Sequence, residues 1–252
     1  MKTNKLITRR EILVGGLTSA GGLLLTGCSR TLPPTYGNIL RMGDALTYSA
    51  QRTVLSGKSL AKEYNQKDIS SFPATGATDP GDPGKPKTSE IYRRLQSGGF
   101  ADWRLSVEGL VARPGSFSLA ELKRLPSRTQ ITRHTCEEGW SAIGEWTGVP
   151  LSRVLDAVGM LPEARFVSFY SYDDWADSID LLDALHPQTI LAYGMNGRDL
   201  PVPHGAPVRL RVETQMGYKS MKYLERIVVT SELDDGGAKG NIQNGWAWYV
   251  GI

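Results

Sequence analysis

Cys136 is the residue of greatest chemical interest, because it lies in a polar run from Arg133 to Gly139. A thiolate can act as a nucleophile or as a soft metal ligand, whereas a cysteine that only packs in a core usually has apolar neighbours. The one other cysteine is Cys28, so no intramolecular disulfide can form if Cys28 is lipidated. A metal-bound thiolate would account for such a lone cysteine.

A second group of candidate residues lies nearer the C-terminus. Segment 208–213 alternates apolar and charged residues, which puts its two arginines on one face of an expected strand. Two arginines could bind a phosphate through paired hydrogen bonds, although a solvated, charge-paired face is the commoner arrangement. Further on, Gly217 allows close backbone approach, and Ser220 and Lys222 add donors and positive charge. Together these residues indicate a site for an anion.

The elements that must position these residues are mainly strands. Alternating or β-branched runs predict strands at Trp103–Glu108, Thr129–Thr132, Phe166–Tyr170, Thr189–Tyr193, Val208–Glu213 and Arg226–Thr230. Asn196 and Gly197 supply a hairpin turn. Regular strand–helix alternation is absent, so the pattern favours a mixed, mainly β fold of the α+β class over a doubly wound parallel sheet.

Helices are expected to be few and short. Ser118 and Glu121 form a capping box that starts one, and Pro126 ends it. Leu151 to Val158 is amphipathic and is closed by Gly159. A helix-like piece is expected from Ala45 to Tyr64, ahead of a long loop rich in proline and glycine. The aromatic C-terminal tail, which contains Trp246, Trp248 and Tyr249, should pack back on the body.

The first residues predict export. Thr8 to Leu13 reads as a twin-arginine signal, and the apolar run that follows is short for a membrane span. Leu25 to Cys28 is similar to the lipobox of bacterial lipoproteins. The expected organisation is a signal peptide at 1–27, a tether with a loop and helix at 28–87, and a catalytic domain at 88–252. This predicts a periplasmic or cell-envelope protein that is held at the membrane by a lipid on Cys28.

Charge argues against nucleic acid as a partner. The chain of 252 residues has 29 basic and 26 acidic side chains, and four of the basic ones with one acidic lie in the first eleven residues. The remaining body is therefore balanced, whereas binding to phosphate backbones needs a concentrated basic surface.

Several motifs in a fixed order resemble the sulfite oxidase family of molybdopterin oxidoreductases. They are Asp102 to Leu110, Arg133 to Trp140, Trp146 to Leu151, Ile190 to Gly197, His204 to Arg209, and Gly217 to Lys222. The resemblance covers roughly Tyr92 to Thr230. It implies a mainly β domain that buries a molybdenum–molybdopterin cofactor.

The resemblance also implies roles for single residues. Cys136 matches the thiolate ligand of the metal. His204 and Arg209 match positions that hold the pterin and its phosphate, Ser220 and Lys222 match a phosphate clamp, and Ser171 matches a further pterin contact. Arg133 and Glu138 match residues on the substrate side. A further cofactor contact is expected from the loop near Ala74 to Pro80.

The implied activity is two-electron oxygen-atom transfer on a small oxo-donor or oxo-acceptor, in a direction that the sequence leaves open. Cys136, Glu138, Trp140 and Ser141 follow the pattern of periplasmic methionine sulfoxide reductase catalytic subunits, whereas His204 is the residue found in sulfite oxidases. Motifs for haem, flavin or nicotinamide binding do not occur in the sequence, so a membrane haem-b subunit or a c-type cytochrome is the expected electron partner.

Two other classes of function stay open. Cys136 and His134 could serve a cysteine-dependent hydrolase if the run between them is extended. Alternatively, the chain could be a lipid-anchored binding module that keeps the fold without catalysis.

Overall fold

The computed structural model describes residues 36–54, 59–85 and 89–252. The expected export signal and the lipidation site at Cys28 lie outside these residues. The unit that carries the candidate site runs from Arg41 to Ile252. Among the described helices, we find none whose length and apolar character would suit a bilayer span.

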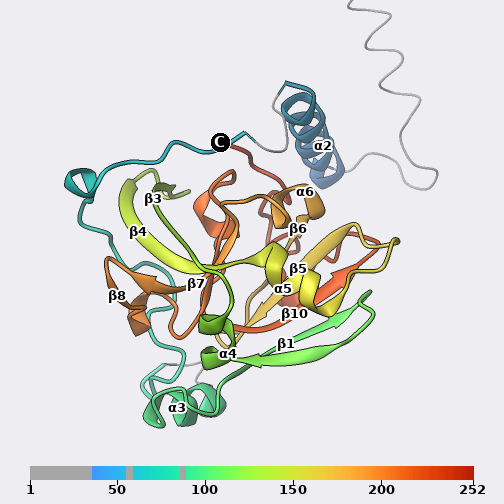
Figure 1. Cartoon of the computed structure of the whole chain (residues 1–252). Coiled ribbons are helices and arrows are strands. Elements are labelled where there is room, and N and C mark those ends of the chain that lie inside the picture. The colour runs from blue at the N-terminus through green and yellow to red at the C-terminus, as the bar shows by residue number, and fades with distance from the viewer. Residues whose placement is uncertain (1–35, 55–58, 86–88) are drawn as a thin grey trace, which may run out of the picture. The chain divides into compact units, whose positions relative to one another are not determined.

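The described strands form two sheets of five (Figure 1). The first has the order β2 (Gly115–Ser118), β1 (Arg104–Gly109), β10 (Leu224–Thr230), β5 (Phe166–Ser171) and β6 (Ala176–Asp180). The second has the order β3 (Arg128–Thr135), β4 (Ser141–Pro150), β7 (Ile190–Met195) and β8 (Arg198–Asp199), and β9 (Arg209–Arg211) also pairs with β7. β1 and β10 are parallel, and the other pairs are antiparallel.

Short helices connect the strands. The α-helices are α2 (Tyr36–Val54), α3 (Glu90–Ser97), α4 (Leu119–Arg124), α5 (Leu151–Val158) and α6 (Leu181–Ala184), and the 3₁₀ turns are η1 (Gln66–Asp68), η2 (Val202–His204), η3 (Gly217–Lys219) and η4 (Gly237–Lys239). The capping box of α4 is confirmed, with Ser118 and Glu121 bonding each other's backbone. Gly159 closes α5 in the left-handed conformation, at φ +70°.

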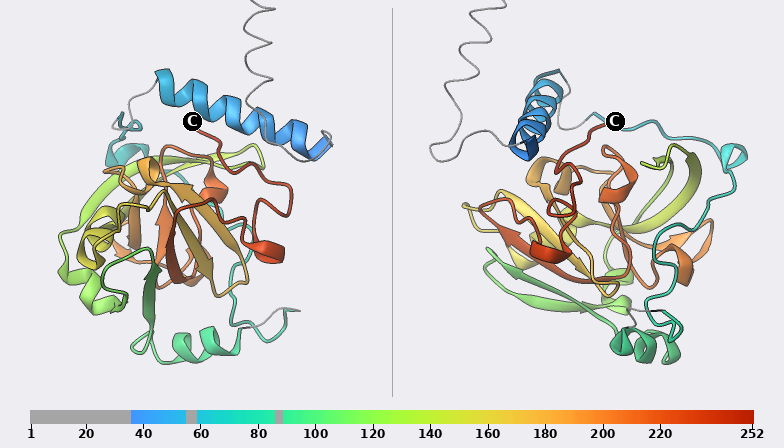
Figure 2. Two further views of the ribbon diagram at one scale, coloured as in Figure 1. Left: turned by 90° about the vertical axis from the view of Figure 1, so that its right-hand side faces the viewer. Right: turned by 180° about the vertical axis from the view of Figure 1, so that it is seen from behind.

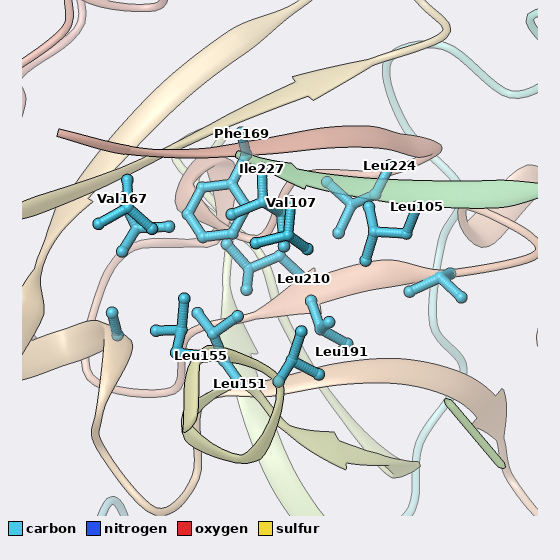
Figure 3. Close-up of a cluster of buried hydrophobic side chains, with 14 of the residues drawn as sticks. Leu105, Val107, Leu151, Leu155, Val167, Phe169, Leu191, Leu210, Leu224 and Ile227 are labelled. Atoms are coloured by element: carbon cyan, nitrogen blue, oxygen red, sulfur yellow. The ribbon is translucent and has the colours of Figure 1, made fainter. Parts of the chain in front are cut away.

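The core lies between the two sheets, as Figure 3 shows. Val107, Phe169 and Ile227 project from the first sheet, and Leu191 and Leu210 project from the second. The side chains that face one another across this layer are fully buried. The α+β, mainly β class expected from the sequence is confirmed, and the layer fixes the frame on which the Cys136 hairpin and the anion-site segments lie.

One helix boundary differs from the sequence prediction, and strand β2 was not predicted. The helix expected to reach Tyr64 ends at Val54, and the chain from Leu60 onward is extended. Glu63 bridges Thr132, and the Tyr64 amide donates to the Ile131 carbonyl at 2.8 Å. The edge of β3 thus offers backbone hydrogen bonds to this segment, which local propensity does not reveal. Strands β4 and β6 also have no counterpart in the prediction.

The C-terminal tail packs back on the body, as predicted. The ring of Trp248 lies 4.9 Å from that of Tyr48 in α2, and the Tyr249 hydroxyl donates to Gln51 Oε1 at 2.9 Å. Figure 2 shows this segment, in red, passing beside α2. The Met216 amide donates to the Val250 carbonyl at 2.9 Å. The end of the chain is thereby tied to the segment that enters η3.

Candidate functional site

A cavity of about 340 Å³ collects most of the candidate residues. Its walls come from the loop Phe72–Ala77, the turn between β3 and β4, the segment around η2, and η3. The predicted residues that line it are Cys136, Glu138, His204, Arg209, Ser220 and Lys222. Segments far apart in the sequence therefore meet at one place.

The β3–β4 hairpin positions Cys136 at the cavity wall. The Cys136 amide donates to the Trp140 carbonyl at 2.9 Å, and Gly139 turns the chain at φ +89°, where a glycine is favoured. The thiol lies 3.5 Å from Glu137 Oε2 and 3.9 Å from Glu138 Oε2. Burial raises the pKa of Cys136 to about 11, with the two carboxyls acting in the same direction. The sulfur therefore stays protonated at neutral pH until a cation replaces the proton.

His134 is unsuited to act as the base of a hydrolase. Arg211 Nη1 donates to His134 Nδ1 at 2.9 Å, since a guanidinium can only donate. Burial and the nearby Arg211 lower the pKa of His134 to about 2, so the ring is neutral. Because His134 does not take up a proton and the Cys136 thiol retains its own, the two side chains cannot form a thiolate–imidazolium pair. The geometry disfavours the hydrolase alternative.

Arg209 lies at the floor of the cavity with only 4% of its surface exposed. Its Nη1 donates to the His204 carbonyl at 3.0 Å and its Nη2 to the Ser220 carbonyl at 2.7 Å. Among the described residues, its buried Nε has no hydrogen-bond partner. Burial and Arg211 lower the pKa of Arg209 to about 9. A buried cation with an unused donor is the arrangement that an anionic ligand would complete.

Lys222 adds a second cation to this wall. Its Nζ donates to the Thr75 carbonyl at 2.9 Å and to the Ala77 carbonyl, which fastens the loop Phe72–Ala77 over the cavity. Burial and the charge of Arg209 lower the pKa of Lys222 to about 8. The hydrogen-bond partners of Arg209 and Lys222 are neutral carbonyl oxygens, so the two side chains keep positive charge that favours an anion here, although Asp173 offsets part of it.

Two predicted site residues lie outside the cavity lining. Ser171 sits behind it, where its hydroxyl donates to Asp173 Oδ1 and to the Trp175 carbonyl and so shapes the turn that carries both residues. Arg133 is exposed, with its guanidinium 5.4 Å from the centre of the Tyr64 ring. Because side chains alternate along β3, Arg133 points away from the face that carries His134. The geometry does not place it beside a substrate.

The solvated face considered for the β9 arginines is also corrected. Arg211 and Glu213 are each 1% exposed in their side chains and form a paired salt bridge at 2.7 and 3.0 Å. The ring of Trp146 lies 4.4 Å from Arg211. Local alternation placed the two arginines on one face correctly but could not show that His134 of β3 and Trp146 of β4 lie against that face.

Sequence reasoning missed several lining residues. Asp173 is half-buried on the wall, and its pKa is raised by burial. Tyr218, Asn241 and Trp246 come from η3 and the C-terminal segment. The apolar tail was a signal that this segment packs on the body, but nothing local indicated which part of the body it would meet.

Comparison with known proteins agrees with this geometry. Residues 94–237 match the family described as "Oxidoreductase molybdopterin binding domain". The chain is 35% identical, over 98% of its length and 89% of the relative's, to the "Putative protein-methionine-sulfoxide reductase subunit YedZ1" of Azospira oryzae. It is 32% identical, over 90% of its length and 71% of the relative's, to the protein-methionine-sulfoxide reductase catalytic subunit MsrP of Xanthomonas axonopodis pv. citri.

A solved structure also resembles the fold. The sulfane dehydrogenase SoxCD from Paracoccus pantotrophus aligns with a TM-score of 0.51 and 26% identity. The alignment covers 54% of this chain and 40% of that chain. The likeness therefore concerns a shared domain within a longer protein.

Proposed function

The chain belongs to the family of oxidoreductases with a molybdopterin-binding domain. From this premise we propose that its cavity holds a molybdenum–molybdopterin cofactor and that the enzyme reduces a sulfoxide. The names of the two relatives support a methionine sulfoxide residue as substrate. The oxygen leaves as water when the sulfoxide takes up two electrons and two protons.

The residues of the cavity fit such a cofactor. Cys136 offers a soft sulfur donor to a metal that is already bound by sulfur. The unpartnered Nε of Arg209, with Lys222 and the Ser220 hydroxyl, suits a phosphate, and His204 lies beside them for the pterin. When bound, the group would supply the two-electron oxygen-atom exchange, and the chain would supply binding, orientation and protons.

One observation favours a neutral substrate over an anionic one. The Cys136 thiol lies between two carboxyl groups, those of Glu137 and Glu138, which line the same cavity. An anion such as sulfite would meet like charge next to the metal ligand, whereas an uncharged sulfoxide would not. Trp140 Nε1 donates to Glu138 Oε2 at 2.9 Å and holds that carboxylate in place beside the thiol, where it can position the substrate.

The direct test is a comparison of two substrates. Protein purified from a host that makes molybdopterin should contain about one molybdenum per chain and should reduce methionine sulfoxide with a reduced viologen dye as electron donor. Sulfite with an artificial acceptor should turn over at least about a hundredfold more slowly. Faster turnover of sulfite than of methionine sulfoxide would favour the second candidate, a sulfite-oxidising enzyme, which the histidine at position 204 supports.

Replacing Arg209 should separate cofactor binding from folding. Arg209→Ala should lower the molybdopterin content at least about tenfold, because a charge-assisted bond to phosphate is lost, while the apolar face of β9 is untouched. Pterin content by fluorescence after oxidation and the midpoint of urea unfolding measure the two effects. The exposed Arg124→Ala is the matched control. Full pterin content in Arg209→Ala would contradict the assignment.

We further propose that the enzyme works outside the cytoplasm and receives electrons from a separate redox protein, a membrane haem-b subunit or a c-type cytochrome. The relatives' names describe them as subunits, which supports a partner. The sequence features at residues 1–28 support export by the twin-arginine route and a lipid on Cys28.

Export can be tested on the paired arginines. Replacing Arg9 and Arg10 together by lysine should leave precursor in the cytoplasm, because the receptor reads the guanidinium pair and an ammonium cannot replace it. Fractionation and immunoblotting measure the distribution. Cys28→Ala should release soluble protein into the periplasm, and normal periplasmic levels of the double lysine variant would contradict the route.

A further inference from the structure

Two exposed tryptophans lie at the rim of the cavity. Trp175 and Trp246 both line it, yet they expose 40% and 37% of their surfaces. They come from different parts of the chain, since Trp175 lies in the turn between β5 and β6, and Trp246 lies beyond the residues matched by the family model. A side chain that both lines a cavity and faces solvent marks its entrance.

Buried polar bonds fix the two segments against each other. The Asn241 amide donates to the Ala176 carbonyl at 2.9 Å, and its side chain donates to Asp177 Oδ2 at 2.8 Å. Lys219 Nζ lies 2.6 Å from Asp177 Oδ1, with both side chains at most 1% exposed. The C-terminal segment, the start of β6 and η3 therefore share one buried network next to the cavity.

Tyr218 extends the aromatic surface from Trp246 into the cavity. The two rings lie 5.0 Å apart, and the Tyr218 hydroxyl donates to the Ala247 carbonyl at 2.6 Å. The cations Arg209 and Lys222 lie elsewhere on the lining, where they suit an anion. This rim of Trp175, Tyr218 and Trp246, which we call the aromatic rim, is an apolar entrance to a cavity whose wall also carries the two cations.

We propose that the aromatic rim is a binding subsite for the apolar part of the substrate beyond its reacting sulfur, namely the side-chain methylene groups of a methionine sulfoxide residue in a polypeptide. Methylene groups gain free energy when aromatic rings cover them, and the rim surface that now faces water becomes covered as well. A small polar sulfoxide lacks the chain that would reach it. The inference rests on the proposed function, because the aromatic rim is proposed to bind the substrate of that function.

The test compares substrates of different length. In Trp246→Ala and in Trp175→Ala, KM for a peptide that contains methionine sulfoxide should rise about tenfold, the effect expected when about two methylene groups lose their burial. The turnover number kcat should change less than about twofold, and KM for dimethyl sulfoxide should change much less than KM for the peptide. Leu182→Ala, which removes an exposed leucine outside the cavity lining, is the control.

Each result decides the question. Unchanged peptide KM in both tryptophan variants, with wild type active, overturns the subsite and leaves the proposed function standing. Equal increases of KM for the peptide and for dimethyl sulfoxide, or a loss of molybdenum that accounts for the lost activity, would make the rim structural and also overturn it. A loaded wild-type enzyme that reduces no sulfoxide would overturn the proposed function and, with it, the subsite.

Discussion

Cys136→Ser is expected to lower sulfoxide reduction at least about a hundredfold while the fold and most of the pterin content remain. Losing even an outer partner of a metal ligand costs 10- to 100-fold, so replacing the ligand itself should cost no less. The hydroxyl is a harder donor than a thiol and loses its proton less readily. The backbone bonds that hold the hairpin turn do not involve the sulfur, so the wall of the cavity should persist.

Loss of turnover alone would not identify the role of Cys136, because a hydrolase would also lose activity. Metal analysis and electron paramagnetic resonance of the bound molybdenum distinguish the two, since loss of a sulfur ligand must change the signal. Ser141→Ala, an exposed position on the same hairpin, should retain both activity and signal. Identical spectra for wild type and Cys136→Ser would show that the sulfur does not bind the metal.

The sequence predicted the chemically distinctive residues that meet in the cavity better than it predicted the segments that form the rest of its wall. Cys136 in its polar run, and Ser220 and Lys222 after Gly217, are local signals, and all three residues line the cavity. Strand alternation was also readable, so the strands at β1, β5 and β10 were predicted within a few residues. Alternation cannot show which face of a strand another element covers. Arg133 was expected at the site but is exposed, whereas Arg211 was expected on a solvated face but is buried.

Residues that reach the site through long-range contacts were the hardest to predict. The loop Phe72–Ala77 was expected only as a vague cofactor contact, and its position depends on carbonyl bonds to Lys222, far along the chain. Trp246 reaches the rim because Asn241 bonds to β6. Such pairings depend on the completed sheets, so no window of the sequence contains them.

Breaking the buried pair of Arg211 and Glu213 is expected to give the largest loss of stability. Arg211→Ala should lower the free energy of unfolding by about 3–5 kcal/mol, because Glu213 would remain buried and, among the described residues, would keep Gln130 Nε2, at 3.1 Å, as its one side-chain donor. Urea unfolding of the cofactor-free protein measures the loss. The exposed pair of Arg104 and Glu121 supplies the control, and Arg104→Ala should cost less than about 1 kcal/mol.

A double variant decides whether the cost comes from the pair or from the stranded charge. Replacing Arg211 by methionine and Glu213 by leucine together removes both charges at similar volume and should recover much of the stability lost in Arg211→Ala. It should not recover function, because His134 Nδ1 would lose the donor that holds the ring against the cavity wall. If Arg211→Ala lowers the free energy of unfolding by no more than Arg104→Ala does, the buried ion pair does not contribute more to stability than an exposed one. A stable but inactive double variant would show that the ion pair serves the geometry of the site more than the stability of the fold.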